Sequence, residues 1–329
     1  MNRKSGEIPL GSRASEPLRG KTVLVIVGPT ATGKSEVAFE IARNRNAEIV
    51  SADSMQIYRD MDIGTAKPEP EIRKIVPHHL IDIADFKQPF SAALYQKKAR
   101  GAIDDILKRD KLPILVGGTG LYVRAAIDDF KFPEGNIEAR IRNDLEEELS
   151  QKGIDDLYNE LIKIDPEAAD FIDKNNGRRI IRALEVYRLT GKPFSDFRKQ
   201  GEKPKSIYPV VIAGLKLDRE VLYDRINRRV KTMIEKGLIE ETQRLIESSY
   251  REAIVSGQAI GYKELIDYID GKDPLSEAVE KIKTRTRHYA KRQITWFNKD
   301  PRIVWFNAEN PRRTVKEIEL LIEAAVPCN

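Results

Sequence analysis

Short apolar runs alternate with amphipathic stretches over the first 130 residues of the chain. The run "KTVLVIVG" ends in a glycine, and the segment "SEVAFEIARN" after it has the spacing of a helix. Residues 90–110 also have a helical pattern. Three further runs are strand-like: "AEIVSADS", "HHLIDI" and "LPILVGGTG". Strands that alternate with helices predict an α/β fold, with a P-loop-type parallel sheet flanked by helices and the ligand at the carboxyl ends of the strands.

The pattern changes after about residue 132. Ile137, Ile141, Leu145 and Leu149 are four apart, as on one face of a helix, and "IDDLYNELIKID" and "GRRIIRALEVYRLTG" read as two more helices. Residues 192–208 are rich in Pro, Lys and Ser and read as a connector, after which "PVVIAGLKLD" is again strand-like. We therefore expect a disordered tail, an α/β core in two pieces and an all-helical insertion: residues 1–19, residues 20–133 with 205–329, and residues 134–204.

A long helix is predicted over residues 219–242, "REVLYDRINRRVKTMIEKGLIEET". At about 100° per residue, its apolar stripe runs through Leu222, Ile226, Val230 and Met233, and Arg229 falls within that stripe. An arginine on an apolar face needs an anionic partner or a route to water. Arg229 therefore forms a buried ion pair with a protein carboxylate, or it closes an anion site.

Composition narrows the class of protein. The chain has a net charge of +5 and a pI near 9.0, which permits a nucleic-acid partner without requiring one. No apolar run approaches the ~18 residues needed to cross a membrane. The single cysteine, Cys328, excludes an internal disulfide framework and is typical of a reducing cytoplasm. The adjacent His78 and His79 point to opposite faces of a strand, so they cannot chelate one metal together.

The strongest chemical signal is G-x-x-x-x-G-K-S, in which loop amides and a helix N-terminus bind phosphate. Its residues are Gly28, Pro29, Thr30, Ala31, Thr32, Gly33, Lys34 and Ser35. An ATPase also needs an Asp after a second apolar strand to hold Mg²⁺, yet "LPILVGGTG" ends in Gly117, Gly118 and Thr119. Asp53, at the end of "EIVSADS", is a metal-side carboxylate, a general base or a helix N-cap. A purely structural glycine turn is the alternative to the phosphate site.

Residues 284–300, "TRTRHYAKRQITWFNKD", interleave basic side chains with aromatic ones. This combination suits an RNA backbone and unstacked bases. A solvated helix face packed by Trp296 and Phe297 explains the pattern equally well.

Taken together, eight segments in order resemble the bacterial tRNA dimethylallyltransferases, also called tRNA isopentenyltransferases. They run from about residue 23 to residue 306. The segments are "GPTATGKS", "SADSMQIYRDMDIGTAKP", "VPHHLIDI", "LVGGTGLYVRA", "RRIIRALEVYRLTGKP", "LDREVLYDRINRRVKTMIEKGL", "QAIGYKEL" and "AKRQITWF".

The resemblance implies transfer of a dimethylallyl group from its diphosphate to N6 of the adenosine 3′-adjacent to the anticodon, in the anticodon stem-loop of a tRNA. The cradle then holds dimethylallyl diphosphate, with Mg²⁺ as cofactor and Ser35 as a metal ligand. By position, Asp53 corresponds to the base on N6, Thr119 to a residue near the bridging oxygen and Arg229 to a diphosphate-binding arginine. The resemblance also implies a cytoplasmic enzyme without membrane attachment, which we expect to be a monomer.

The same resemblance implies three tRNA-contacting segments, with Thr119 as a further contact. Their residues are Asp53, Ser54, Met55 and Gln56; Arg178, Arg179, Ile180, Ile181 and Arg182; and Ala253, Ile254, Val255, Ser256, Gly257 and Gln258.

Two other enzyme classes stay open from the residues alone. One is an isopentenyltransferase acting on free adenine nucleotides, and the other is a P-loop small-molecule kinase. The expected helical insertion argues against the first, because a free nucleotide needs no such element. A non-catalytic RNA-binding module has no use for Lys34 and Ser35.

Overall fold

The structure is a computed structural model that describes residues 22–88, 90–132, 139–200, 204–253 and 256–325. The expected tail, residues 1–19, lies outside the described residues. The chain divides into two compact units, one formed by residues 1–127 with 208–329 and the other by residues 128–207. The expected insertion, residues 134–204, falls inside the second unit. None of the described helices is long and apolar enough to span a membrane.

A six-stranded sheet forms the centre of the first unit, and every strand pair in it is parallel. The spatial order is β3-β2-β4-β1-β5-β6. The predicted parallel sheet is thus confirmed. Its strands are β1 (Val23–Val27), β2 (Ala47–Ser51), β3 (His78–His79), β4 (Leu112–Gly117), β5 (Val210–Lys216) and β6 (Ile303–Asn307).

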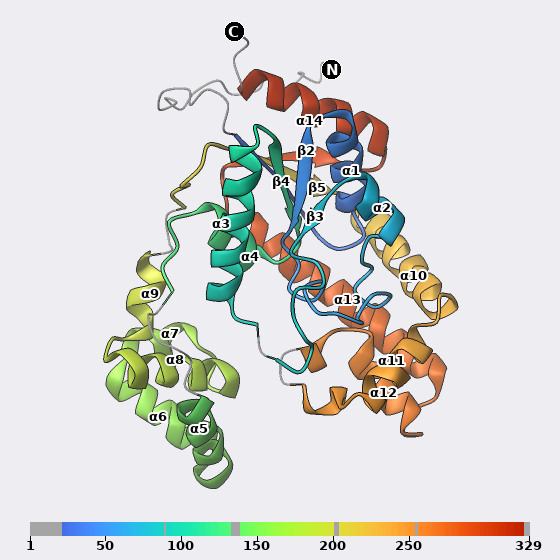
Figure 1. Cartoon of the computed structure of the whole chain (residues 1–329). Helices are drawn as coiled ribbons and strands as arrows, with labels where there is room; N and C mark the ends of the chain where they lie inside the picture. Colours follow the sequence, from blue (N-terminus) through green and yellow to red (C-terminus); the bar gives the residue numbers. More distant parts are fainter. Residues whose placement is uncertain (1–21, 89, 133–138, 201–203, 254–255, 326–329) are drawn as a thin grey trace, which may run out of the picture. The chain divides into compact units, whose positions relative to one another are not determined.

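Helices cover both faces of this sheet, as Figure 1 shows for α1 and α3. α1 (Lys34–Asn44) and α14 (Pro311–Ala325) share one apolar core with side chains of β1, β2, β4 and β5. α3 (Ala92–Lys108) packs on β2 and β4, and α4 (Gly120–Ile127) packs on α3. Because both faces are covered, the central strand β1 is apolar throughout rather than alternating, and all five of its residues are buried.

The other helices of this unit form a group in which α13 contacts α4, α10 and α12. The single helix predicted over residues 219–242 is wrong, because Gly237 has a left-handed backbone (φ 96°) that ends one helix and starts the next. The helices are α2 (Pro70–Ile75), α10 (Arg219–Glu235), α11 (Leu238–Glu247), α12 (Tyr262–Ile269) and α13 (Leu275–Phe297), with 3₁₀ turns at Tyr250–Glu252 and Ser256–Gln258.

The second unit is helical, and its core includes Leu145, Leu161 and Leu184. Ile137 of the predicted apolar stripe lies outside the described residues. The prediction of a plain connector over residues 192–208 is wrong in part: α9 forms there, and Ser195 donates its backbone N–H to the buried Asp165 (2.8 Å). The helices are α5 (Ala139–Lys152), α6 (Ile154–Ile164), α7 (Pro166–Phe171), α8 (Gly177–Thr190) and α9 (Phe194–Gln200).

The strand predicted for "HHLIDI" is only two residues long. Leu80 and Asp82 have left-handed backbones (φ 65° and 58°), which no strand accommodates, and Asp82 forms ion pairs with Lys67 and Arg73 instead. His79 hydrogen-bonds the buried Glu48 (2.8 Å). The pair of histidines therefore has a structural role, as predicted from their adjacency.

Candidate active site

The loop from β1 to α1 forms an anion-binding turn. Gly28, Ala31 and Gly33 all have positive φ (142°, 66° and 87°), and a Cβ on Gly28 would lie 2.4 Å from the backbone oxygen of Leu215. The Thr32 hydroxyl closes the loop by donating to the backbone oxygen of Pro29 (2.9 Å). The first amides of α1 then face the end of the sheet without intrahelical acceptors, which is the arrangement that binds phosphate.

Lys34 adds a positive charge to this loop, and its ammonium group loses a proton more readily than that of a free lysine. Its Nζ donates to the backbone oxygen of Pro29 (2.6 Å). Burial, and after it the nearby charge of Arg229, lowers the pKa of Lys34 to about 7, while Asp53 opposes the shift. An anion bound here would favour the charged form.

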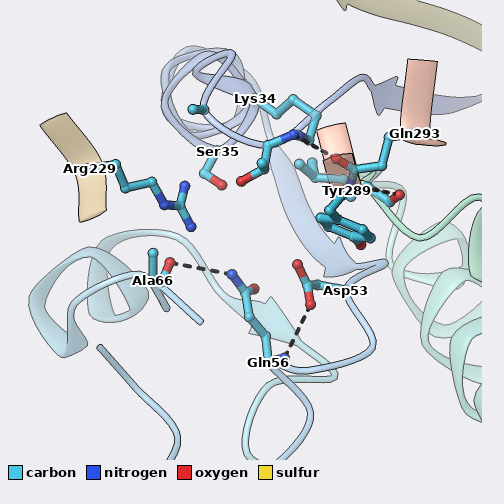
Figure 2. A pocket seen from close by; sticks show the side chains of 13 residues that line it. Lys34, Ser35, Asp53, Gln56, Ala66, Arg229, Tyr289 and Gln293 are labelled. Atoms are coloured by element: carbon cyan, nitrogen blue, oxygen red, sulfur yellow. Dashed lines mark hydrogen bonds between the residues drawn. The ribbon is translucent and has the colours of Figure 1, made fainter. Parts of the chain in front are cut away.

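Asp53 follows β2 and turns the chain back on itself. Its Oδ1 accepts the backbone N–H of Met55 (2.9 Å) and that of Gln56 (3.4 Å). The next residues form a turn and no helix, so the N-cap interpretation is wrong. In Figure 2 the carboxylate points into the pocket. One oxygen, Oδ1, is thus held by the backbone, while the other has no backbone donor among the described residues.

The end of β4 has no room for the carboxylate that an ATPase places there. A Cβ on Gly117 would lie 2.1 Å from the backbone oxygen of Ala52. The same oxygen accepts the N–H of Thr119 (3.2 Å), whose hydroxyl in turn accepts the N–H of Ser54 (3.1 Å). The two loops are therefore joined by hydrogen bonds, and Asp53, which follows β2 at the same edge of the sheet, is a carboxylate that lines the pocket.

Arg229 faces the same pocket from α10. No described residue forms an ion pair or hydrogen bond with it in the structure, so the alternative of a buried ion pair finds no support among those residues. Burial lowers the pKa of its guanidinium, and only Asp53 opposes that shift. Two cations thus share a half-buried pocket with one carboxylate, which is an environment that favours an anionic ligand.

Figure 2 shows Arg229, Ser35, Asp53 and Gln56 directed at one space. α13 supplies two more walls of this pocket, Tyr289 and Gln293, which the sequence did not single out as site residues. The sequence feature that indicates a shared face for these two residues is their i, i+4 spacing within the basic and aromatic segment, residues 284–300. The pocket is lined by Thr30, Ala31, Lys34, Ser35, Asp53, Gln56, Ala66, Val116, Gly117, Gly118, Arg229, Tyr289 and Gln293.

The segments expected to contact tRNA differ in accessibility. Arg178 and Arg179 are exposed at the start of α8, whereas Ile180 and Ile181 are buried in the core of their unit. Those two isoleucine side chains are not accessible to an RNA. Arg182 forms an ion pair with the buried Glu185 (2.7 Å).

In the third segment, Gln258 is exposed and Gly257 is half-buried. Ala253 is buried, and so is Ser256, whose hydroxyl donates to the backbone oxygen of Phe86 (2.7 Å). Ile254 and Val255 lie outside the described residues. Contact through side chains is therefore open to Gln258, and Gly257 can contribute its backbone.

Comparison with known proteins gives one consistent family. The family model described as IPP transferase matches residues 56–300, and one described as isopentenyl transferase matches residues 21–84. The tRNA dimethylallyltransferase of Carboxydothermus hydrogenoformans is 49% identical over 92% of this chain and 97% of its own length. That of Geobacillus thermodenitrificans is 46% identical over 90% of this chain and 94% of its own length.

Solved structures agree. The full-length tRNA isopentenylpyrophosphate transferase of Bacillus halodurans has a TM-score of 0.70 at 44% identity, and the match covers 93% of this chain and 97% of that one. A eukaryotic dimethylallyltransferase acting on tRNA has a TM-score of 0.78 at 30% identity, over 94% of this chain and 81% of that one.

Proposed function

Because the chain belongs to the IPP transferase family, we propose that it transfers the dimethylallyl group of dimethylallyl diphosphate to N6 of an adenosine in tRNA. We place that adenosine in the anticodon loop, on the 3′ side of the anticodon. The reaction releases diphosphate. One observation carries the proposal: the phosphate loop shares its pocket with Arg229 and Asp53, and the neighbouring strand β4 ends in glycine. Arg229 has no ion-pair partner among the described residues, and the Asp53 carboxylate is held by backbone amides.

The donor side of the site suits an allylic diphosphate. As the carbon–oxygen bond breaks, positive charge spreads over the allylic carbons and negative charge grows on the diphosphate. Lys34, Arg229 and the amides at the start of α1 stabilise that negative charge. We also propose that the Thr119 hydroxyl, which accepts the N–H of Ser54 and donates to the Ser54 hydroxyl in this structure, turns to donate to the bridging oxygen when the donor binds.

The acceptor side depends on Asp53. The lone pair of N6 is delocalised into the adenine ring, which makes the amine a poor nucleophile. The pocket-facing oxygen of Asp53 accepts a hydrogen bond from N6 and then its proton, as the new carbon–nitrogen bond forms. The adenine must first leave its stack, and this costs least in a single-stranded loop.

The donor set also fits Mg²⁺. That ion prefers oxygen ligands, and it usually takes one or two from the protein and the rest from phosphates and water. Ser35 and Asp53 both line the pocket, and the described residues include no group of three or more His, Cys, Asp or Glu arranged to hold a metal ion without further ligands. Bound there, Mg²⁺ would neutralise charge on the diphosphate. We propose Ser35 as its protein ligand.

The comparisons do not favour the two alternative classes. The relatives at 46–49% identity over about nine-tenths of the chain are tRNA dimethylallyltransferases rather than kinases or enzymes of free nucleotides. A tRNA substrate also agrees with the exposed Arg178, Arg179 and Gln258. We propose that the protein works as a monomer in the cytoplasm, where tRNA is modified.

The test is incubation of the protein with dimethylallyl diphosphate, Mg²⁺ and bulk tRNA, followed by mass spectrometry of the nucleosides. We expect an adenosine carrying one added dimethylallyl group. Asp53→Asn keeps an oxygen for the Met55 amide but removes the basic group, so kcat should fall by about 10²-fold or more while tRNA affinity changes little. Absence of the modified nucleoside with the wild-type protein contradicts the function, and near-normal turnover of Asp53→Asn contradicts the role of the carboxylate.

A further inference from the structure

Gln293 lies buried between the two loops that build the pocket. Its Oε1 accepts the backbone N–H of Thr30 in the phosphate loop (2.8 Å), and its Nε2 donates to the backbone oxygen of Gly118 (2.9 Å). The residue is 5% exposed. Each partner lies at the end of a different strand, and Gln293 itself comes from α13, so a single amide joins three separate segments of the chain.

The glycines around Thr119 make space for this contact. A Cβ on Gly118 would lie 2.0 Å from Nε2 of Gln293, and a Cβ on Gly120 would lie 2.0 Å from Nε1 of Trp296. The side chains of Gln293 and Trp296 on α13 thus lie against the backbone on either side of Thr119. A side chain at Gly118 would displace the Gln293 amide and break its bond to the Gly118 oxygen.

Further hydrogen bonds link Gly118 to the turn that holds Asp53, the proposed base. Thr119, the next residue, donates its N–H to Ala52 and accepts the N–H of Ser54, the two neighbours of Asp53 in the chain. A continuous series of contacts therefore runs from the phosphate loop through Gln293 to the turn that holds Asp53. One end of the series contacts the leaving group of the proposed reaction, and the other end contacts the nucleophile.

We infer that Gln293 is a positioning residue that fixes the separation between the diphosphate and the adenine. It does so by hydrogen-bonding both the phosphate loop and the loop of residues 118–120 after β4. The inference rests on the proposed function and goes beyond it, because Gln293 is assigned no contact with the reacting atoms. Misplacement of reacting groups by about 1 Å costs on the order of 10²-fold in rate. Loss of these hydrogen bonds should therefore slow transfer without weakening binding of either substrate.

Loss of the Gln293 hydrogen bonds should also change the product of the reaction. When the allylic carbon–oxygen bond breaks and N6 is out of reach, a water oxygen can attack the carbon instead. The products are then dimethylallyl alcohol, diphosphate and a proton, and the tRNA is left unmodified. The ratio of dimethylallyl alcohol to prenylated tRNA thus reports on positioning, whereas a loss of folded protein lowers both products equally.

The test variant is Gln293→Met, which keeps the length of the side chain and removes both hydrogen bonds. We expect kcat for tRNA to fall about 10- to 100-fold, with the donor KM and the tRNA Kd within about threefold of wild type. The ratio of alcohol to prenylated tRNA should rise at least about fivefold. The matched control is Gln243→Met, the same substitution at an exposed position of α11, which should behave as wild type.

Wild-type protein and Gln243→Met also test the proposed function in the same assay, since both must prenylate tRNA whatever Gln293 does. If Gln293→Met does not fold, Gln293→Glu is tested instead. Its carboxylate can still accept the N–H of Thr30, but it cannot donate to the Gly118 oxygen and is repelled by it. A kcat within twofold of wild type would overturn the inference. A loss of kcat with an unchanged product ratio, or a loss confined to donor KM, would overturn it as well.

Discussion

Arg229 differs from Arg225 and Arg228 of α10 in having no ion-pair or hydrogen-bond partner among the described residues. Arg228, one position earlier, is exposed and pairs with Asp224, and Arg225 donates to the backbone oxygens of Ala308 and Glu309. In the sequence, Arg229 is also set apart by its position within the apolar stripe of the helix. The sequence could not decide between a protein carboxylate and a ligand, because that depends on which side chains the fold places opposite it.

Replacing Arg229 separates these roles. Arg229→Gln should raise the donor KM by about 10- to 100-fold, because a charge that stabilises the diphosphate is lost. Its melting temperature should stay at or above that of wild type, since a positive charge beside Lys34 is removed and no ion pair with a described residue is broken. Arg228→Gln is the control and should leave both quantities unchanged. A large loss of stability with an unaltered donor KM would instead reveal a structural role.

Lys34 makes donor binding depend on pH. Its pKa in the free protein is about 7, lowered by burial and by Arg229, so at pH 8 most molecules carry a neutral Lys34. A bound diphosphate favours the charged form, and binding at pH 8 should therefore take up most of one proton. At pH 6 the lysine is already charged and the uptake should fall.

Calorimetry with dimethylallyl diphosphate in two buffers of different ionisation enthalpy measures this uptake. Lys34→Met should abolish the uptake at pH 8. Equal uptake in wild type and variant would contradict the role of this lysine.

At the scale of elements, the loop after β2 is held in place by hydrogen bonds to one buried carboxylate. Glu241 of α11 accepts the backbone N–H groups of Asp62, Ile63 and Gly64 and the hydroxyl of Tyr262 (2.6 Å). The carbonyls of Thr65 and Ala66 then accept the amide of Gln56, a pocket residue. The loop that carries Asp53 and Gln56 is thus fixed by a helix almost 200 residues further along the chain.

Removing this anchor should destabilise the protein and the site together. Glu241→Ala leaves three partly buried amides without an acceptor, which should cost about 2–4 kcal/mol of unfolding free energy. Because Gln56 loses its support, kcat of the remaining folded protein should fall as well. Glu240→Ala, at the neighbouring exposed position of α11, should cost less than about 0.5 kcal/mol. Urea unfolding of the two variants checks the comparison, and equal stabilities would contradict it.

The contrast between these elements shows what sequence reasoning can reach. The strand ending in Gly28, the phosphate loop and Asp53 were predicted because their signals are local: apolar runs, glycine spacing and a polar strand end. Glu241, Tyr289 and Gln293 were missed because their roles arise from contacts distant in sequence. The break at Gly237 was missed because a single glycine within a periodic pattern only lowers helix propensity, and the left-handed turn is settled by packing.

At the scale of the whole molecule, the two units have different chemistry. The unit built on the sheet holds the phosphate loop, Asp53 and Arg229, which is all that the proposed transfer of the prenyl group requires. The described residues of the helical unit, residues 128–207, contribute none to the lining of this pocket, and Arg178 and Arg179 of that unit are exposed to solvent. A free nucleotide would have no use for the second unit, whereas a folded RNA offers it a backbone of phosphates to contact.

The central claim is that the phosphate loop serves an isoprenoid donor while Asp53 receives an adenine from a folded tRNA. The most direct measurement compares kcat/KM for three acceptors with dimethylallyl diphosphate as the donor. These are an anticodon stem-loop with adenosine 3′ to the anticodon, the same stem-loop with guanosine there, and AMP. We predict transfer to the adenosine stem-loop and none to the guanosine stem-loop, because guanosine lacks the N6 amine. The kcat/KM for AMP should be lower than that for the adenosine stem-loop by orders of magnitude, because AMP lacks the remote contacts that position the base. Equal kcat/KM for AMP and the adenosine stem-loop would contradict the account and make the protein an enzyme of free nucleotides.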